Sequence, residues 1–247
     1  MSSLRQPICP QFVFVCCAAI LLVLGMGSPA AAQTPVDLQL VLAVDASGSV
    51  NAERFELQRR GYVEAFRDKQ VLQAIGGGGA NQSIAVAMFQ WTGPSLQRQI
   101  VPWTIVKNAE TAEAVASLMA TTPRQLFSGG TSISGAIDYA MKWFPHSPFQ
   151  SERRVIDVSG DGSNNSGRSV LRARDEAISA GVVINGLPIL AWEPQLDLYY
   201  KDNVIGGPGS FMIVARDFEI FADAILKKMI LEIAGAPSRG VIRIGKR

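Results

Sequence analysis

Leu38 to Val44 reads LQLVLAV, and the polar loop Asp45-Ala46-Ser47-Gly48-Ser49 follows it at once. A continuous apolar run of this length is typical of a strand that is buried on both faces of a sheet. In open α/β sheets, ligands bind beyond the carboxyl ends of the strands, where the strand order reverses. This stretch therefore predicts a buried parallel strand and places polar side chains where such a sheet binds its ligand.

Strand patterns alternate with amphipathic helix patterns along the rest of the chain, which predicts a doubly wound α/β fold with a mostly parallel sheet flanked by helices. Pro102 places one strand at an edge, because proline cannot donate a hydrogen bond. We interpret Gly76 to Gly79 as a connector and Trp192 to Gly209 as irregular. The other predicted strands are 84–89, 98–105, 154–158, 182–190 and 211–215, and the predicted helices begin near 52, 108, 131, 169 and 217.

The first 32 residues have the three-part plan of a secretory signal peptide. Arg5 supplies a positive start, Phe12 to Met26 is apolar, and Ala30-Ala31-Ala32 is a small-residue cleavage site. The alternative is an uncleaved membrane anchor, but the apolar run is about 15 residues, short of the roughly 20 that span a bilayer. We therefore expect an exported protein, periplasmic or secreted after cleavage.

The composition of the exported part excludes several functions. All three cysteines lie in the leader, so this part has no disulfide, no thiol nucleophile and no cysteine-ligated zinc. Leaving out Arg5 and the four basic residues of 237–247, the chain has 18 basic and 21 acidic residues, which predicts no nucleic-acid binding. We interpret 237–247 as a solvated basic tail, with weak contact to an anionic membrane surface as the alternative.

Three polar loops are predicted to meet at the carboxyl edge of the sheet. Gly129-Gly130-Thr131 enters a helix and Gly160-Asp161-Gly162 follows the strand 154–158, in addition to the loop after Val44. The side chains offer oxygen, and neither sulfur nor imidazole, which suits a hard cation. Hydroxyls with few carboxylates leave room for the waters that Mg²⁺ usually keeps. The loops predict a magnesium site; Ca²⁺, which wants more carboxylate or carbonyl oxygens, ranks second, and Mn²⁺ stays open.

Asp-x-Ser-x-Ser, Gly-Gly-Thr and Gly-Asp-Gly, in this order, resemble the metal-ion-dependent adhesion site of von Willebrand factor type A domains. The resemblance extends from about Asp37 to Ala234, and more narrowly the chain is similar to a group of uncharacterised exported bacterial proteins. It implies that hydroxyls ligate the metal, that the carboxylates act directly or through water, and that one position stays open for an Asp or Glu of a protein partner. The residues carried over are Asp45, Ser47, Ser49, Thr131 and Asp161.

The third loop departs from the family pattern. Many members have Thr-Asp-Gly there, whereas this chain has Ser159-Gly160-Asp161-Gly162, so Ser159 stands for the Thr and the extra Gly160 puts the position of Asp161 in doubt. Asp157 lies within the predicted strand, which favours Asp161 as the site residue. Without a metal, the same residues serve as helix caps and turns.

We expect a signal peptide at 1–32, one type A-like domain at 33–236 and a tail at 237–247, with binding to a protein partner as the function and no enzymatic activity. The first alternative is a metal-free scaffold of an envelope complex. The second is a metal-dependent hydrolase, which needs a general base near the metal. Glu53 is the nearest candidate base, and the single histidine, His146, lies in a predicted surface turn.

Four aromatic residues are candidates for contact with the partner. Aromatic side chains near the site suit a recognition surface, and long loops often carry function. For the two tryptophans, partial burial in the core is favoured over contact with a partner. The four residues are Trp91, Trp192, Tyr199 and Tyr200.

Overall fold

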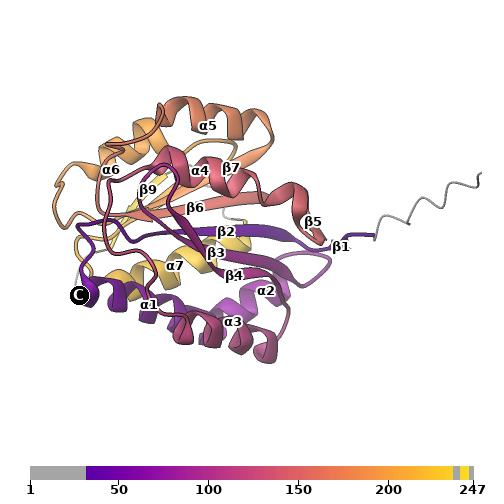
Figure 1. Ribbon diagram of the computed structural model, residues 1–247. Coiled ribbons are helices and arrows are strands. Elements are labelled where there is room, and N and C mark those ends of the chain that lie inside the picture. Colours follow the sequence, from indigo (N-terminus) through magenta and orange to yellow (C-terminus); the bar gives the residue numbers. More distant parts are fainter. Residues whose placement is uncertain (1–31, 236–239, 245–247) are drawn as a thin grey trace, which may run out of the picture. The chain divides into compact units, whose positions relative to one another are not determined.

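A computed structural model describes residues 32–235 and 240–244 of the chain. A sheet with the strand order β4-β3-β2-β6-β7-β8-β9 forms the centre, and its neighbouring strands are parallel except β3 and β4 (Figure 1). A two-stranded parallel sheet joins β1 (Thr34–Pro35) to β5 (Phe149–Gln150). The strands of the central sheet are β2 (Leu38–Asp45), β3 (Ile84–Trp91), β4 (Gln97–Val106), β6 (Arg154–Gly160), β7 (Val182–Pro188), β8 (Phe211–Val214) and β9 (Gly240–Arg243).

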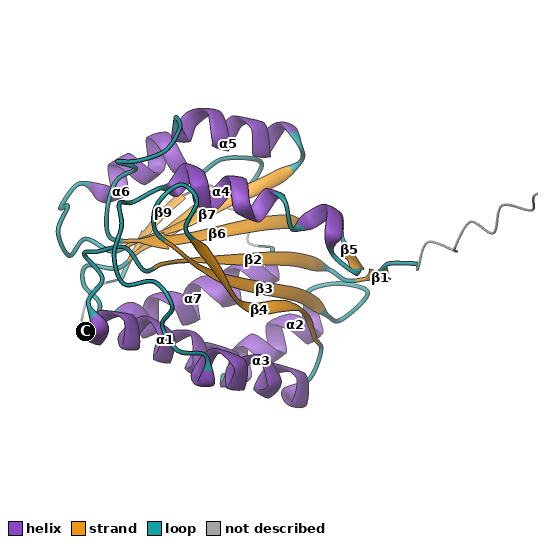
Figure 2. Cartoon of the chain, viewed as in Figure 1, coloured by secondary structure: helices purple, strands orange, loops and turns teal. Residues whose placement is uncertain are grey.

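Helices cover both faces of this sheet (Figures 1 and 2). On one face lie α1 (Ala52–Arg67), α2 (Lys69–Gly77), α3 (Ala109–Thr121) and α7 (Phe221–Ala234). On the other face lie α4 (Ile133–Met141), α5 (Val170–Ser179) and α6 (Leu196–Tyr199). The predicted doubly wound, mostly parallel α/β fold is confirmed, and β4, which contains Pro102, is an edge strand as expected.

The central strand β2 explains why its sequence is apolar without interruption. Successive side chains of a strand point to opposite faces. Leu40 and Leu42 pack in the layer that contains α1 and α7, whereas Val41 and Ala43 pack in the layer that contains α4. Both faces are covered, so every position of β2 is buried.

The strand order reverses between β2 and β6, which are hydrogen-bonded neighbours from Gln39↔Arg154 to Val44↔Ser159. From β2 the chain passes through α1 and α2 to β3 on one side, and it returns through α4 to β6 on the other side. The predicted binding edge, at the carboxyl ends of these two strands, is therefore the switch point of the sheet.

Several elements differ from their predictions. The stretch from Trp192 to Gly209 contains α6 and the π-helical turn η2 (Tyr200–Val204), and Gly76 and Gly77 belong to α2. The expected tail contributes β9, which pairs in parallel with β8. The expected helix cap Asp217 accepts a hydrogen bond from the backbone N–H of Ile220 at 3.1 Å, and α7 begins one residue after Ile220. These elements depend on contacts with distant parts of the chain, which local patterns do not record.

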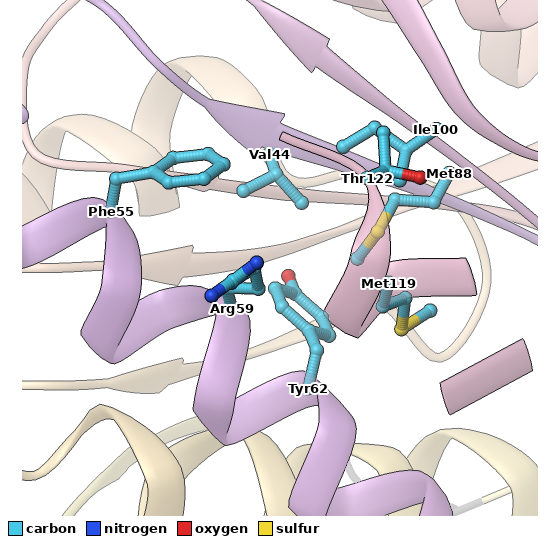
Figure 3. A pocket seen from close by; sticks show the side chains of 8 residues that line it. All are labelled: Val44, Phe55, Arg59, Tyr62, Met88, Ile100, Met119 and Thr122. Atoms are coloured by element: carbon cyan, nitrogen blue, oxygen red, sulfur yellow. The ribbon is translucent and has the colours of Figure 1, made fainter. Parts of the chain in front are cut away.

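The face of the sheet that α1 and α3 cover contains a small cavity of about 20 Å³. Figure 3 shows Phe55 and Tyr62 of α1 around it, with Val44 and Met88 of the sheet and Met119 of α3. Its lining is almost wholly apolar and its size is close to that of one water molecule. At this size it has no room for a ligand larger than water.

The predicted signal peptide at 1–32 lies outside the described residues, except for its last position. Among residues 32–235 and 240–244, no helix combines the length and the hydropathy that crossing a membrane requires.

Candidate metal centre

Three loops meet where β2 and β6 end, and hydrogen bonds join each pair of them. We call them loop 1 (residues 45–51), loop 2 (122–132) and loop 3 (161–169). The N–H of Gly48 donates to the carbonyl of Gly129 at 3.3 Å, which joins loops 1 and 2. The hydroxyl of Ser49 donates to Oδ1 of Asp161 at 2.5 Å, which joins loops 1 and 3. The predicted meeting of the three loops is therefore present.

Loop 1 brings its oxygen side chains together by a tight turn. Oδ1 of Asp45 accepts from the N–H of Ser47 at 2.7 Å, and this short local bond bends the chain directly after β2. The hydroxyls of Ser47 and Ser49 are consequently 3.2 Å apart. Asp45 and Ser47 are buried and Ser49 is exposed, so the cluster opens to solvent on the side of Ser49.

Loop 2 is fixed to loop 3 through the backbone of Thr131. Its N–H donates to the side-chain oxygen of Asn165 at 2.8 Å, and its carbonyl accepts from the N–H of Asn165 at 2.9 Å. Ser132, and not Thr131, caps α4 through the N–H of Gly135. Thr131 Oγ1 lies against Gly162, 3.5 Å from where a β-carbon on that glycine would stand. The Thr131 hydroxyl is therefore beside loop 3 and is not used as the helix cap.

Loop 3 accommodates the extra glycine at the end of β6. A β-carbon on Gly160 would stand 2.9 Å from the hydroxyl of Tyr200 and 3.0 Å from Oδ2 of Asp45, distances that a side chain does not tolerate. Because a glycine is present, both groups pack against the backbone, and Asp161 still reaches Ser49. Ser159 faces α1, where its hydroxyl accepts from Tyr62 at 3.3 Å.

The two carboxylates of the site lack full hydrogen-bonding. Oδ2 of Asp45 and Oδ2 of Asp161 are buried and have no hydrogen-bond partner among the described residues. Burial, together with the charge of Asp161, raises the pKa of Asp45 to about 7, and burial raises the pKa of Asp161 as well. The guanidinium of Arg54 stands 4.0 Å from Asp161 Oδ2, beyond hydrogen-bond distance. A cation is the group that such a pair of oxygens lacks.

The donor set fits a hard divalent cation. It consists of the Asp45 and Asp161 carboxylates and the Ser47, Ser49 and Thr131 hydroxyls, all oxygen. Among the described residues, no group of three or more His, Cys, Asp or Glu side chains is placed so that it could hold a metal ion. The two unpartnered carboxylate oxygens are the observation that supports the fit.

Asp157 belongs to a different group of residues, at the centre of the sheet. It faces α7, and Oδ1 lies 3.1 Å from Nζ of Lys228. Lys228 also pairs with Glu232 at 2.8 Å, and Glu232 accepts from the amide of Asn185, which stands opposite Asp157 on β7. The preference for Asp161 over Asp157 therefore agrees with the geometry.

Two of the four residues considered as partner contacts are buried in the structure. Trp91 and Tyr200 are both fully buried, so neither of these candidates can contact a partner; for Trp91, burial is the interpretation that the sequence favours. Trp192 is exposed, and Tyr199 is half-buried with its hydroxyl accepting from the N–H of Asn164 at 3.3 Å. Trp91 ends a strand whose two faces are covered, so its position next to the site did not imply exposure.

Glu193 is a residue near the site that the sequence did not indicate. It follows β7, and its carboxylate accepts from the N–H and the hydroxyl of Ser163 in loop 3, at 3.0 and 2.5 Å. The candidate base Glu53 is exposed on the first turn of α1, and His146 is exposed beside β5 at the opposite edge of the sheet. The adjacency of Glu193 and Ser163 comes from the pairing of β6 with β7, which no local motif encodes.

This fold and this arrangement of loops define a von Willebrand factor type A-like domain. Solved structures with the same fold include a von Willebrand factor type A protein from Catenulispora acidiphila (16% identity, TM-score 0.57, 80% of this chain and 43% of that one). Another is the pilus adhesin SpaC from Lactobacillus rhamnosus GG (15%, 0.58, 81% and 31%). A third is proximal thread matrix protein 1 from the mussel byssus, with a zinc-occupied MIDAS motif (14%, 0.53, 80% and 47%).

The chain belongs to the family described as protein of unknown function DUF1194, whose profile matches residues 35–237. It spans less than half the length of each of the three solved chains. No curated protein sequence matches it.

Proposed function

We propose that this protein is an exported, non-enzymatic binding domain that captures a carboxylate of a protein partner through a divalent metal, preferentially Mg²⁺. The residues that would hold the metal are Asp45, Ser47, Ser49, Thr131 and Asp161. One observation carries the proposal: two buried carboxylates, each with one unpartnered oxygen, adjoin hydroxyls at an opening of the surface.

The chemistry of the ligands supports capture of a carboxylate. Hydroxyls are neutral, so they leave most of the charge of a divalent ion uncompensated, and Mg²⁺ usually keeps exchangeable positions that a partner oxygen can take. A carboxylate from an incoming Asp or Glu would then complete the coordination. Export is supported by the leader pattern of residues 1–32, and one solved relative in fold is a pilus adhesin.

Binding is proposed in preference to catalysis because, among the described residues, the acidic groups at the loops other than the proposed ligands are already engaged or exposed. Glu193 accepts two hydrogen bonds from Ser163, and Glu53 is exposed on α1. His146 lies at the other edge of the sheet.

Calorimetric titration of the exported protein with Mg²⁺, Mn²⁺ and Ca²⁺ tests the proposal. The protein is expressed from its full sequence, and its intact mass shows whether the leader has been removed. We expect binding of about one ion, lost in Asp45→Ala and weakened in Ser49→Ala. Ser128→Ala in loop 2, which removes an exposed hydroxyl, is the matched control and should bind as the wild type. No binding at millimolar ion by the wild type would leave the metal-free scaffold as the function.

A further inference from the structure

Arg54 lies at the rim of the metal centre between two aromatic rings. Its guanidinium carbon is 4.6 Å from the ring centre of Trp192 and 5.2 Å from that of Phe218. Phe218 is buried, whereas Trp192 is 62% exposed. Nη1 of Arg54 donates to the carbonyl of Ser49 at 2.9 Å. The charged group is thus held in one place beside loop 1, and an exposed ring covers it.

Arg124 repeats this arrangement with different residues. Its guanidinium carbon is 5.3 Å from the ring centre of Phe127 and 5.5 Å from that of Phe55. Phe55 is buried, whereas Phe127 is 70% exposed. Nη2 of Arg124 donates to the carbonyl of Ala46 at 3.1 Å. A second guanidinium is thus held against loop 1 between a buried and an exposed ring.

The two exposed rings stand on segments that follow different strands. Phe127 belongs to loop 2, which is hydrogen-bonded to the segment after β3 through Ser132 and Thr92. Trp192 belongs to the loop after β7. Since β3 and β7 flank the β2–β6 pair on opposite sides, the two rings come from both sides of this pair, while both arginines donate to loop 1.

Exposed apolar side chains concentrate at the same edge. Six large hydrophobic residues of the described chain are exposed, and four of them, Leu96, Phe127, Trp192 and Leu198, follow β3, α3 or β7 at the carboxyl edge. Concentration of exposed aromatic and aliphatic side chains around a polar site is typical of a protein-interaction surface.

Two guanidinium groups at this edge have no carboxylate bonded to them. Among the described residues, neither Arg54 nor Arg124 has a carboxylate within hydrogen-bond distance, whereas Arg67 pairs with Glu113 at 2.6 Å. Of the acidic side chains nearby, Glu53 is exposed, Ser163 holds Glu193, and Asp202 lines the surface beside Trp192. The two guanidinium groups can therefore receive carboxylates of an anionic partner.

We propose that the pairs Arg54–Trp192 and Arg124–Phe127 form the docking surface for an acidic protein segment in which apolar side chains alternate with carboxylates. This rests on the proposed function, since one carboxylate of the segment binds the metal. The flanking carboxylates bind the two guanidinium groups, which present planar, fixed donors. The apolar side chains of the segment cover the exposed faces of Phe127 and Trp192.

The test measures metal and peptide binding separately on the exported protein. The probes are a synthetic peptide in which aspartates alternate with phenylalanine and leucine, a peptide of equal charge with glycine in place of the apolar residues, and phosphatidylglycerol vesicles. The variants are Arg54→Gln, Arg124→Gln, Trp192→Ala and Phe127→Ala. The matched controls are Arg60→Gln on α1, which changes a surface arginine, and Leu171→Ala on α5, which changes an exposed leucine outside the two pairs.

In Mg²⁺ we expect the wild type to bind the apolar–acidic peptide more tightly than the glycine peptide. Each of the four variants should bind the first peptide about five- to tenfold more weakly. Trp192→Ala and Phe127→Ala should bind the metal as the wild type does, because these two side chains act on the partner and make no hydrogen bond to loop 1. The control variants should match the wild type. Trp192 emission should shift to shorter wavelength on binding, and Trp192→Phe should keep most of the affinity but lose this shift.

The outcomes separate the two proposals. Metal binding with wild-type peptide affinity in all four variants overturns the docking surface and leaves the metal proposal standing. Equal peptide binding in EDTA and Mg²⁺, weakened in the four variants, supports the docking surface and overturns metal capture. Two results overturn the acidic segment as partner. One is that the peptide does not bind at millimolar concentration in Mg²⁺. The other is that the arginine variants weaken binding to the vesicles but do not weaken binding to the peptide.

Discussion

Two groups of buried carboxylates lie on β6 or next to it, and they differ in whether a cation of the protein is bonded to them. The edge pair, Asp45 and Asp161, has no cation of the protein at hydrogen-bond distance. The central cluster, Asp157 and Glu232, contains Lys228, which pairs with both. Buried charges are stable only when they are compensated. The central cluster is compensated by Lys228 from within the chain, whereas the edge pair is the pair that we propose to hold a metal ion.

The position along the strand explains the difference. Asp157 is in the middle of β6 and faces α7, where only side chains of the protein can reach it. Asp161 follows the end of β6, where loops replace helices and an ion can enter. Asp157 therefore belongs to a structural ion pair, whereas Asp161, four residues later, belongs to a candidate binding site.

The largest effect is expected from Lys228→Met. This variant leaves two carboxylates buried without a cation, and removal of one partner of a buried ion pair typically costs about 3–5 kcal/mol in the free energy of unfolding. Urea unfolding at pH 7, with and without Mg²⁺, measures it. The triple variant Lys228→Met, Asp157→Asn, Glu232→Gln should recover a large part of the loss, because it removes the uncompensated charges as well. A loss below 1 kcal/mol in the single variant would contradict the role assigned to Lys228.

The pH dependence of the central cluster is expected to be the next largest effect. Burial raises the pKa of Asp157 from 3.8 to about 6, although Lys228 opposes the shift. A carboxyl group whose pKa is raised by folding contributes most to stability when the pH is below its pKa in the unfolded chain. This contribution is therefore lost as the pH rises from about 4 to about 6. At about 1.4 kcal/mol for each pKa unit, the change is on the order of 2–3 kcal/mol.

Asp157→Asn isolates this contribution. The difference between the unfolding free energies of the wild type and this variant, followed from pH 4 to pH 7, should move in favour of the variant as the pH rises. A constant difference would show that Asp157 ionises normally in the folded protein.

Gly160→Ala tests the crowding around the edge pair. The added β-carbon would meet the Tyr200 hydroxyl and Asp45 Oδ2, so we expect a loss of about 1–3 kcal/mol in stability, together with weaker metal binding. Tyr200→Phe in the same protein removes one of the two clashing atoms and should restore part of both. Wild-type stability of Gly160→Ala would mean that the end of β6 is not closely packed.

The smallest effect is expected from Mg²⁺ on stability. At ten to thirty times the dissociation constant, a ligand of the folded state adds about 1–2 kcal/mol to the free energy of unfolding. Asp161→Asn should lose this increment, whereas Asp157→Asn should retain it, since only the edge pair faces the ion. Thermal unfolding over a Mg²⁺ series measures both. Retention of the increment in Asp161→Asn would remove that residue from the ligand set.

The sequence by itself determined the fold class and the meeting of the loops. A strand that is apolar at every position is stable only where both faces of its sheet are covered. Alternating strand and helix patterns are then compatible with few folds other than a doubly wound sheet. Polar residues that follow such strands must gather at one edge, which is why the sequence predicts that the loops of Asp45, Thr131 and Asp161 meet. The same reasoning separated Asp161 from Asp157, because one follows the strand and the other lies within it.

Only the tertiary structure decided which side chains face solvent and which charges are paired. Trp91 and Tyr200 are aromatic, as many contact residues are, but other elements cover them. Lys228 and Asp157 are 71 positions apart, Arg54 and Trp192 are 138 positions apart, and Arg124 and Phe55 are 69 positions apart. Burial and pairing depend on how elements pack across the sheet, and that packing is a property of the whole chain that no local pattern contains.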